Sequence, residues 1–355
     1  MSDIINQLDM KYNKLSNTDI EVSEICLGTM TFGEQNSESE GHQQMDYALD
    51  AGVNFFDTAE LYAVPSTKEN NGKTEEIIGT WLSKTKKREH IILGTKVAGP
   101  SDNLKYISKN LGFSRKRILE AVEGSLNRLQ TDYIDLYQLH WPERKTNMFG
   151  QRGFPNAAND TWGDNFLDVI ETMNLLIKEG KIRHWGLSNE TPWGTMHVLN
   201  EAEKNGLEKP VSIQNPYSLL NRTYETGMAE VSVRENIGLL AYSPLGFGLL
   251  SGKYHKGTDD KTSRRNKYKE MNRYDSEECY SATTQYLKIA EDNGLSLTQM
   301  ALAFINSRDF ITSNIIGATN LKQLKENIES SKVVLSKEII KNINKVQEKI
   351  PNPAP

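Results

Sequence analysis

Strand-like and helix-like segments alternate along almost the whole chain, and this alternation restricts the possible folds more than any other feature. Eight short apolar runs are each followed by a helical pattern. Their spacing of roughly 30 to 50 residues fits βαβ crossovers, which join parallel strands through a helix. The expected strands are 23–30, 53–57, 90–97, 133–140, 182–188, 211–215, 237–243 and 314–317, and the expected helices are 39–51, 74–83, 114–129, 166–178, 192–204, 223–235, 281–292 and 321–330.

Several of these runs are continuously apolar, as strands buried on both faces should be. Eight units in one chain favour an α/β protein with a closed (β/α)8 TIM barrel over an open doubly wound sheet. We expect an N-terminal appendage over 1–9, a barrel domain over 10–355, and extra helices over 297–307 and 337–346. The long loops 141–165 and 246–275 follow strands, which places them on the catalytic face as lids or as disordered insertions.

Composition excludes several classes of function. The 355 residues carry a net charge of −5 without a basic block, which argues against nucleic-acid and membrane-surface binding. No apolar run approaches about 18 residues, and the N-terminus has no signal-peptide pattern. The cysteines, Cys26 and Cys279, have no metal-ligand spacing; they leave a single disulfide open, but two isolated thiols indicate a reducing cytosol. We therefore expect a cytoplasmic protein without a metal site.

Ionisable side chains recur at the ends of successive expected strands. Asp57 closes one strand and Tyr62 follows it within a few positions, while Lys96 and His140 lie at the ends of the next two strands. Burial of ionisable groups is costly unless they are paired. Their repetition at one end of neighbouring parallel strands is typical of a barrel active site.

The chemistry of these four residues fits proton donation to a carbonyl oxygen. A tyrosine donates a proton readily near neutral pH only if its pKa is lowered, and a neighbouring ammonium group lowers it. Asp57 would keep Lys96 charged and fix its direction, and His140 could hydrogen-bond the oxygen that receives the proton from Tyr62. No protein side chain is a hydride donor, so the reaction would require a nicotinamide cofactor.

Each of the four residues also has a structural explanation. Asp57 could cap a helix, and Lys96 could be a satisfied charge at the edge of the core. His140 could be a structural hydrogen-bond partner, and Tyr62 could be a surface aromatic. Independent accidents would rarely produce this order on successive strands, so the catalytic interpretation is favoured.

Candidate cofactor contacts lie at later strand ends. The run Gly246-x-Gly248-x-x-x-Gly252 departs from the Rossmann fingerprint, since its last spacing is one residue too long and no acidic residue lies at the required distance. Other strand ends offer groups for a carboxamide, an aromatic face, a phosphate-binding turn and positive charge for a 2′-phosphate. The groups for a carboxamide are Ser188, Asn189 and Gln214, and the aromatic face is that of Tyr242, which is followed by Ser243, Pro244 and Leu245. The phosphate-binding turn is Gly317, Ala318 and Thr319, and the groups for a 2′-phosphate are Lys253, Ser263 and Arg264.

Taken together, these motifs resemble the aldo-keto reductases over 10–355. The matching pieces are Leu27-Gly28-Thr29-Met30-Thr31-Phe32-Gly33, Asn54-Phe55-Phe56-Asp57-Thr58-Ala59-Glu60-Leu61-Tyr62, Lys96, Asp135-Leu136-Tyr137-Gln138-Leu139-His140-Trp141-Pro142, Gly186-Leu187-Ser188-Asn189, Tyr242-Ser243-Pro244-Leu245-Gly246 and Ile316-Gly317-Ala318. Residues 33–37, 214–222 and the final Pro-Ala-Pro look like the bacterial Tas-type branch of that family.

The resemblance implies a barrel that binds NADPH without a Rossmann domain. By motif, Tyr62 would be the general acid, Lys96 and Asp57 would tune it, and His140 would orient the carbonyl. The 141–165 insertion is longer than in typical members, so substrate contacts are not carried over there. The implied cofactor contacts are Thr29, Met30, Asp57, Ser188, Asn189, Gln214, Tyr242, Ser243, Pro244, Leu245, Gly246, Gly248, Lys253, Ser263, Arg264, Gly317, Ala318, Thr319, Gln323, Glu326 and Asn327.

Four functions compete at this point. The first is an NADPH-dependent reductase of small-molecule aldehydes or ketones. The second is an NADP(H)-binding sensor with little turnover, as in the potassium-channel β-subunits that share this fold. The third is a Schiff-base aldolase using Lys96. The fourth, a metal hydrolase, is the weakest, because the six histidines are scattered and form no His-x-His at a strand end. Substrate identity, reaction direction and oligomeric state stay open.

Overall fold

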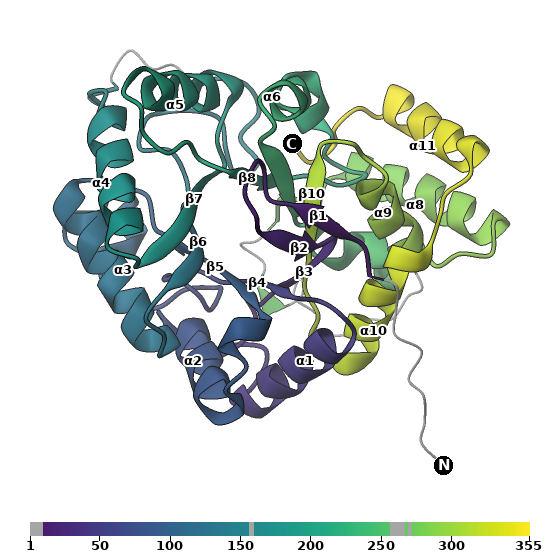
Figure 1. Ribbon diagram of the computed structural model, residues 1–355. Coiled ribbons are helices and arrows are strands. Elements are labelled where there is room, and N and C mark those ends of the chain that lie inside the picture. The colour runs from purple at the N-terminus through teal and green to yellow at the C-terminus, as the bar shows by residue number, and fades with distance from the viewer. Residues whose placement is uncertain (1–9, 156–159, 256–266, 269–271) are drawn as a thin grey trace.

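In the computed structural model, eight parallel strands close into a barrel, as the sequence predicts (Figure 1). The structure describes residues 10–155, 160–255, 267–268 and 272–355. Strands pair in chain order, and the last pairs with the first to close the barrel. The strands are β3 (Ile25–Gly28), β4 (Phe55–Asp57), β5 (Ile92–Val97), β6 (Ile134–Leu139), β7 (Ile182–Ser188), β8 (Ser212–Pro216), β9 (Gly238–Tyr242) and β10 (Ile311–Ile316).

Helices form a ring around the barrel (Figure 1). Most begin at a serine, threonine or asparagine whose side chain accepts a hydrogen bond from the first turn, such as Ser114 before α3 and Thr191 before α5. The helices are α1 (Glu38–Asp50), α2 (Lys73–Thr85), α3 (Arg115–Leu129), α4 (Phe166–Lys178), α5 (Pro192–Lys204), α6 (Met228–Arg234), α8 (Glu277–Asp292), α9 (Leu297–Asn306), α10 (Leu321–Glu329) and α11 (Lys337–Lys349). The expected extra helices are α9 and α11.

α8 begins four residues and β10 three residues before the expected starts, and two other expected elements differ more from the structure. The helix expected over 223–235 is broken: a 3-10 turn, Thr223–Thr226, is separated from α6 by Gly227, whose φ of −157° and ψ of −41° are not helical. The strand expected over 23–30 starts only at Ile25, because Ser23 belongs to a separate antiparallel hairpin that the sequence analysis missed.

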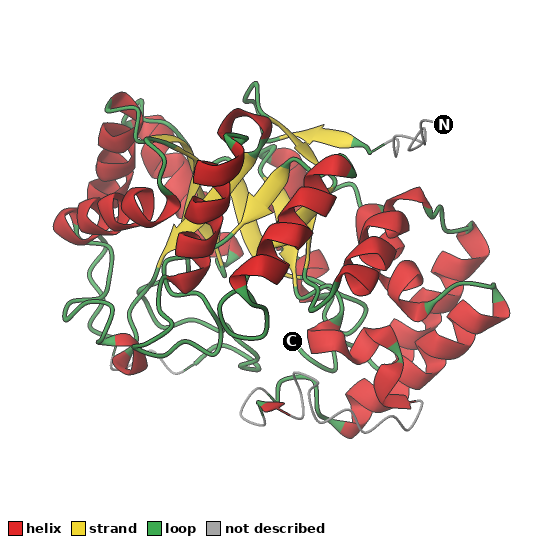
Figure 2. Cartoon of the chain, turned by 90° about the horizontal axis from the view of Figure 1, so that it is seen from below, coloured by secondary structure: helices red, strands yellow, loops and turns green. Residues whose placement is uncertain are grey.

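This hairpin, β1 (Tyr12–Lys14) and β2 (Glu21–Ser23), closes one end of the barrel. Its apolar residues Leu15 and Val22 pack against inward-facing strand residues such as Phe55 and Leu240. Figure 2 shows the hairpin and the long loops at opposite ends of the barrel. The hairpin fills the N-terminal end with side chains, whereas the cavity described below is lined by residues at the C-terminal ends of the strands.

Both cysteines are buried free thiols, Cys26 inside the barrel and Cys279 on α8. In the part of the chain that the structure describes, no helix is both long enough and apolar enough to cross a membrane. The N-terminal appendage expected over 1–9 lies outside the described residues.

Candidate active site

A buried ion pair lies at the C-terminal end of the barrel. Asp57 ends β4, and Lys96 lies on the neighbouring β5. The Lys96 Nζ donates to Asp57 Oδ2 at 2.7 Å and to the Thr58 carbonyl at 2.6 Å. Burial alone would lower the pKa of Lys96, but the Asp57 charge and hydrogen bond raise it above its usual value. Lys96 is therefore a charged ammonium group with no exposure to solvent.

Tyr62 and His140 complete the arrangement. The Lys96 Nζ lies 5.1 Å from the Tyr62 ring centroid, and the Tyr62 and His140 rings are 5.8 Å apart, edge to face. Burial, with a contribution from the Lys96 charge, lowers the pKa of His140 well below its usual value. His140 is therefore neutral and presents one N–H donor. The four residues singled out in the sequence lie in one cluster.

Asp57 is held from its other side by two glutamine side chains. Gln214 Nε2 donates to Asp57 Oδ1 at 2.9 Å, and Gln138 Nε2 approaches the same oxygen at 3.3 Å. Gln138 was missed by the sequence analysis. Its position two residues before His140 on β6 puts it on the same inward face, which is the signal that could have found it.

A second chain of hydrogen bonds runs behind His140. Asn189 Nδ2 donates to the His140 carbonyl at 2.9 Å, and the Tyr242 hydroxyl donates to Asn189 Oδ1 at 2.6 Å. Burial raises the pKa of Tyr242, so its hydroxyl keeps its proton and remains a donor. The Ser188 hydroxyl donates to the Gln214 carbonyl at 2.8 Å. The polar residues at the ends of β6 to β9 thus form one connected network.

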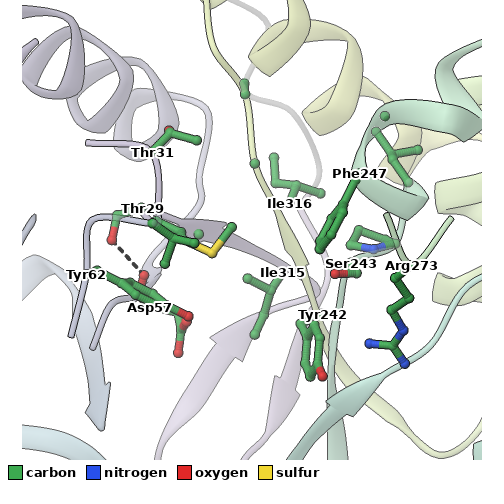
Figure 3. A pocket seen from close by; sticks show the side chains of 18 of the residues that line it. Thr29, Thr31, Asp57, Tyr62, Tyr242, Ser243, Phe247, Arg273, Ile315 and Ile316 are labelled. Atoms are coloured by element: carbon green, nitrogen blue, oxygen red, sulfur yellow. Dashed lines mark hydrogen bonds between the residues drawn. The ribbon is translucent and has the colours of Figure 1, made fainter. Parts of the chain in front are cut away.

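These residues surround a cavity of about 1300 Å³. Figure 3 shows Asp57 and Tyr62 on one side of it and Tyr242, Ser243 and Arg273 on the other, with Ile315 between them. Lys96 lies beneath the cavity, and Gly246 is buried beside it without lining it. The expected cofactor contacts that do line it are Thr29, Met30, Asp57, Ser188, Asn189, Gln214, Tyr242, Ser243, Pro244, Leu245, Gly248, Lys253, Gly317, Ala318, Thr319, Gln323, Glu326 and Asn327. Ser263 and Arg264 lie outside the described residues.

Two backbone turns line the cavity on the side of β9 and β10. After β9, Ser243, Gly246, Phe247 and Gly248 all have positive φ, between 52° and 91°. The Gly246 N–H donates to the Ser243 carbonyl at 3.0 Å and the Gly248 N–H to the Leu245 carbonyl at 2.9 Å, so the turn is closed by its own hydrogen bonds. The Lys253 ammonium lies beside Gly248, close enough that a Cβ there would meet Nζ at 3.6 Å. A positive charge therefore lies beside a tightly turned backbone along this wall of the cavity.

The second turn lies between β10 and α10. Gln323 Oε1 accepts a 3.0 Å hydrogen bond from the Thr319 N–H, and Asn327 Nδ2 donates to the Gly317 carbonyl at 3.1 Å. Both side chains therefore hold the 317–319 turn in place over the N-terminus of α10. A helix N-terminus favours negative charge, so this turn suits a phosphate.

Several lining residues were not foreseen, because they come from irregular segments far apart in sequence. Arg152, from the long loop after β6, donates to the Pro353 carbonyl at 2.7 Å, and Arg273 donates through Nε to the Pro355 carbonyl at 3.1 Å. Phe149 meets Trp141 edge to face at 5.8 Å. The 141–165 loop, the loop after β9 and residues 353–355 thus meet at the cavity rim, where the sequence analysis expected only two loops.

The fold and site together define a (β/α)8 barrel with four clustered ionisable residues at a cavity of about 1300 Å³. The model of the Aldo/keto reductase family matches residues 24–348, so the chain belongs to this family, whose members are oxidoreductases. It is 46% identical to "Protein tas" of Escherichia coli (strain K12) over 98% of this chain and 100% of that protein. It is 34% identical to "Uncharacterized oxidoreductase YrpG" of Bacillus subtilis, over 95% and 96%. It is 31% identical to "Probable voltage-gated potassium channel subunit beta" of Arabidopsis thaliana, over 92% of each chain.

Proposed function

We propose that this protein is an NADPH-dependent reductase that converts aldehyde or ketone carbonyls to alcohols. The observation that carries the proposal is the charged Lys96 beneath Tyr62, with a neutral His140 beside it, at the base of a cavity of about 1300 Å³. Drug-sized ligands occupy pockets of about 300 to 1,000 Å³, so this cavity has room for a dinucleotide and a substrate together.

The residues along the cavity fit NADPH. Asn189 and Gln214 would hold the carboxamide, the Tyr242 ring would stack on the nicotinamide, and the 243–248 and 317–319 turns would hold the phosphates. When bound, NADPH would supply the hydride for the substrate carbon. Arg264 would add charge at a 2′-phosphate, which is the basis for proposing NADPH over NADH.

Three side chains would act on the substrate oxygen. Tyr62 would transfer its hydroxyl proton to the carbonyl oxygen as negative charge develops there. The Lys96 ammonium, fixed by Asp57, would stabilise the phenolate that remains on Tyr62. The neutral His140 would donate an N–H hydrogen bond to the same oxygen and orient the carbonyl. Electrostatic groups already in place need no reorganisation during the reaction.

The test begins with titration of the protein with NADPH and with NADH, followed by turnover measurements on a panel of aldehydes and ketones. Tyr62→Phe should reduce kcat by roughly 10²- to 10⁴-fold, the range for loss of a general acid, while the Kd for NADPH is unchanged. Tyr224→Phe is the matched control, since that buried tyrosine hydroxyl pairs with Ser232 on α6 and does not line the cavity. A Tyr62→Phe variant with wild-type rates would refute the assignment of the acid.

The alternative is an NADP(H)-binding regulatory protein. The observation that favours it is the 31% identity to a probable voltage-gated potassium-channel β-subunit. The same experiment separates the two functions. Tight NADPH binding without turnover of any carbonyl would favour the regulatory function, and turnover that depends on Tyr62 would favour the reductase.

A further inference from the structure

A second buried ion pair lies directly behind the acid–base centre, outside the cavity. Glu60 and Arg117 are about 3% and 5% exposed, and neither lines the cavity. Glu60 Oε1 accepts the Arg117 guanidinium and, at 2.6 Å, the Ala98 N–H. The mechanism proposed above assigns no role to Glu60 or to Arg117.

The position of Glu60 connects the two segments that carry Tyr62 and Lys96. Glu60 lies two residues before Tyr62, and its backbone N–H donates to the Lys96 carbonyl at 3.2 Å. Its carboxylate holds Ala98, two residues after Lys96. A single carboxylate therefore joins the loop after β4 to the end of β5, at the point where the Tyr62–Lys96 separation is set.

Arg117 anchors this carboxylate to a rigid element. It lies in the first turn of α3, and its own N–H donates to the Ser114 hydroxyl that caps the helix. A buried ion pair is weak support for stability, because desolvation of both charges offsets most of their attraction. Such a pair also fixes the relative position of the two segments that carry its charges, here the loop after β4 and the start of α3.

We propose that Glu60 and Arg117 are positioning residues, which fix the separation of the Tyr62 phenol from the Lys96 ammonium. This inference rests on the proposed reductase function of the same site. Loss of the pair would let the loop after β4 shift relative to β5, and a displacement of 1 Å in a reacting group can reduce the rate by about 10²-fold.

The test compares Glu60→Gln with the double variant Glu60→Gln/Arg117→Met, which leaves no unpaired buried charge and guards against simple unfolding. Asp135→Asn is the matched control. The Asp135 carboxylate is also fully buried and accepts one backbone N–H, from Leu93 at 2.9 Å, and the Arg88 guanidinium at 2.7 Å, with the Arg183 guanidinium 3.4 Å from its other oxygen. It lies near the start of β6, at the opposite end of the barrel.

We expect both Glu60 variants to lower kcat, by up to about 10²-fold, with an unchanged KM for NADPH. Asp135→Asn should lose stability and keep its kcat. The inference would be overturned by a double variant with wild-type kcat, or by an equal loss of kcat in Asp135→Asn.

A phenol titration makes the test independent of turnover. The difference in phenolate absorbance between each protein and its Tyr62→Phe derivative reports the ionisation of Tyr62 alone. With the pair lost, the Lys96 ammonium stabilises the phenolate less, so this titration should move to higher pH in both Glu60 variants. An unmoved titration refutes the positioning role, whereas a wild-type protein without carbonyl turnover refutes the proposed function.

Discussion

The Asp57–Lys96 pair gives the sharpest test of how the site is held together. Lys96 has no exposure to solvent, and its ammonium is 2.7 Å from Asp57 Oδ2. Asp57→Asn keeps the shape of the side chain and removes its charge. It also replaces one acceptor oxygen with an NH2 group. In the wild type the Gln214 amide donates to Asp57 Oδ1. In the variant, the new NH2 group faces either the Lys96 ammonium or the Gln214 NH2 group, so two donors meet in both orientations of the amide.

The cost follows from leaving a buried ammonium without its counter-charge. Removal of one partner of a buried ion pair destabilises a protein by about 3–5 kcal/mol. With a urea slope of about 3 kcal/mol per molar, the unfolding midpoint of Asp57→Asn should fall by about 1 to 1.7 M. The double variant Asp57→Asn/Lys96→Met has no buried charge at this position, so it should recover much of that loss.

The pH dependence of the stability should reverse. In the wild type the pKa of Lys96 is raised, so the contribution of the pair is fully present below the ordinary lysine pKa and is lost as the pH rises through the raised pKa. In Asp57→Asn, burial is the largest remaining influence and lowers the pKa of Lys96. The unfolded chain then binds more protons than the folded one, and stability rises with pH up to the ordinary lysine pKa.

Urea unfolding followed by circular dichroism from pH 7 to about pH 10, near the ordinary lysine pKa, measures both effects. Asp135→Asn serves again as the control for loss of a buried carboxylate away from the site. An Asp57→Asn protein with the wild-type midpoint, or with the pH slope of the wild type, would refute the view that Asp57 keeps Lys96 charged.

Two further changes test the barrel wall and the cofactor. Gly28→Ala should destabilise the fold by about 1–3 kcal/mol, because a Cβ there would lie 2.9 Å from the Ile316 carbonyl oxygen of β10. Thermal unfolding measures this loss of stability. The control is Gly163→Ala, where a Cβ meets nothing within 4 Å, and an equal loss in that variant would contradict the prediction. Arg264→Ala should weaken NADPH by about 10- to 100-fold, the value of one charge-assisted contact, and leave NADH unchanged in titrations. An equal effect on both nucleotides, or the same NADPH loss in Arg265→Ala, would remove its 2′-phosphate role.

The barrel could be predicted because each strand–helix unit carries its own local signals. The predicted bounds of α4, α5 and β7 match the structure residue for residue, since each has a clear apolar pattern with glycine, proline or a capping residue at its limits. The N-terminal hairpin was missed because strands of three residues are too short to show a period. The break at Gly227 was missed because the apolar pattern continues across it.

The clustering of the four chemical residues could be predicted because parallel strands bring their ends together whatever the loops do. Arg152, Arg273 and 353–355 followed no such rule. Their meeting at the rim depends on tertiary contacts between irregular segments, such as the hydrogen bond from Arg152 to the Pro353 carbonyl. This contact could not be predicted from motifs, because neither the sequence around Arg152 nor that around Pro353 indicates which residue the other segment contacts.

The structure also changes how the proposed cofactor residues should be tested. Gln214 and Asn189 were singled out as groups for a carboxamide, yet both already bond residues of the proposed catalytic cluster, Gln214 through Asp57 and Asn189 through the His140 carbonyl. Their substitution would therefore alter catalysis even if neither touched the cofactor. The Lys253 ammonium lies beside Gly248, so a loss of NADPH affinity in Lys253→Met with kcat preserved would report on the cofactor site.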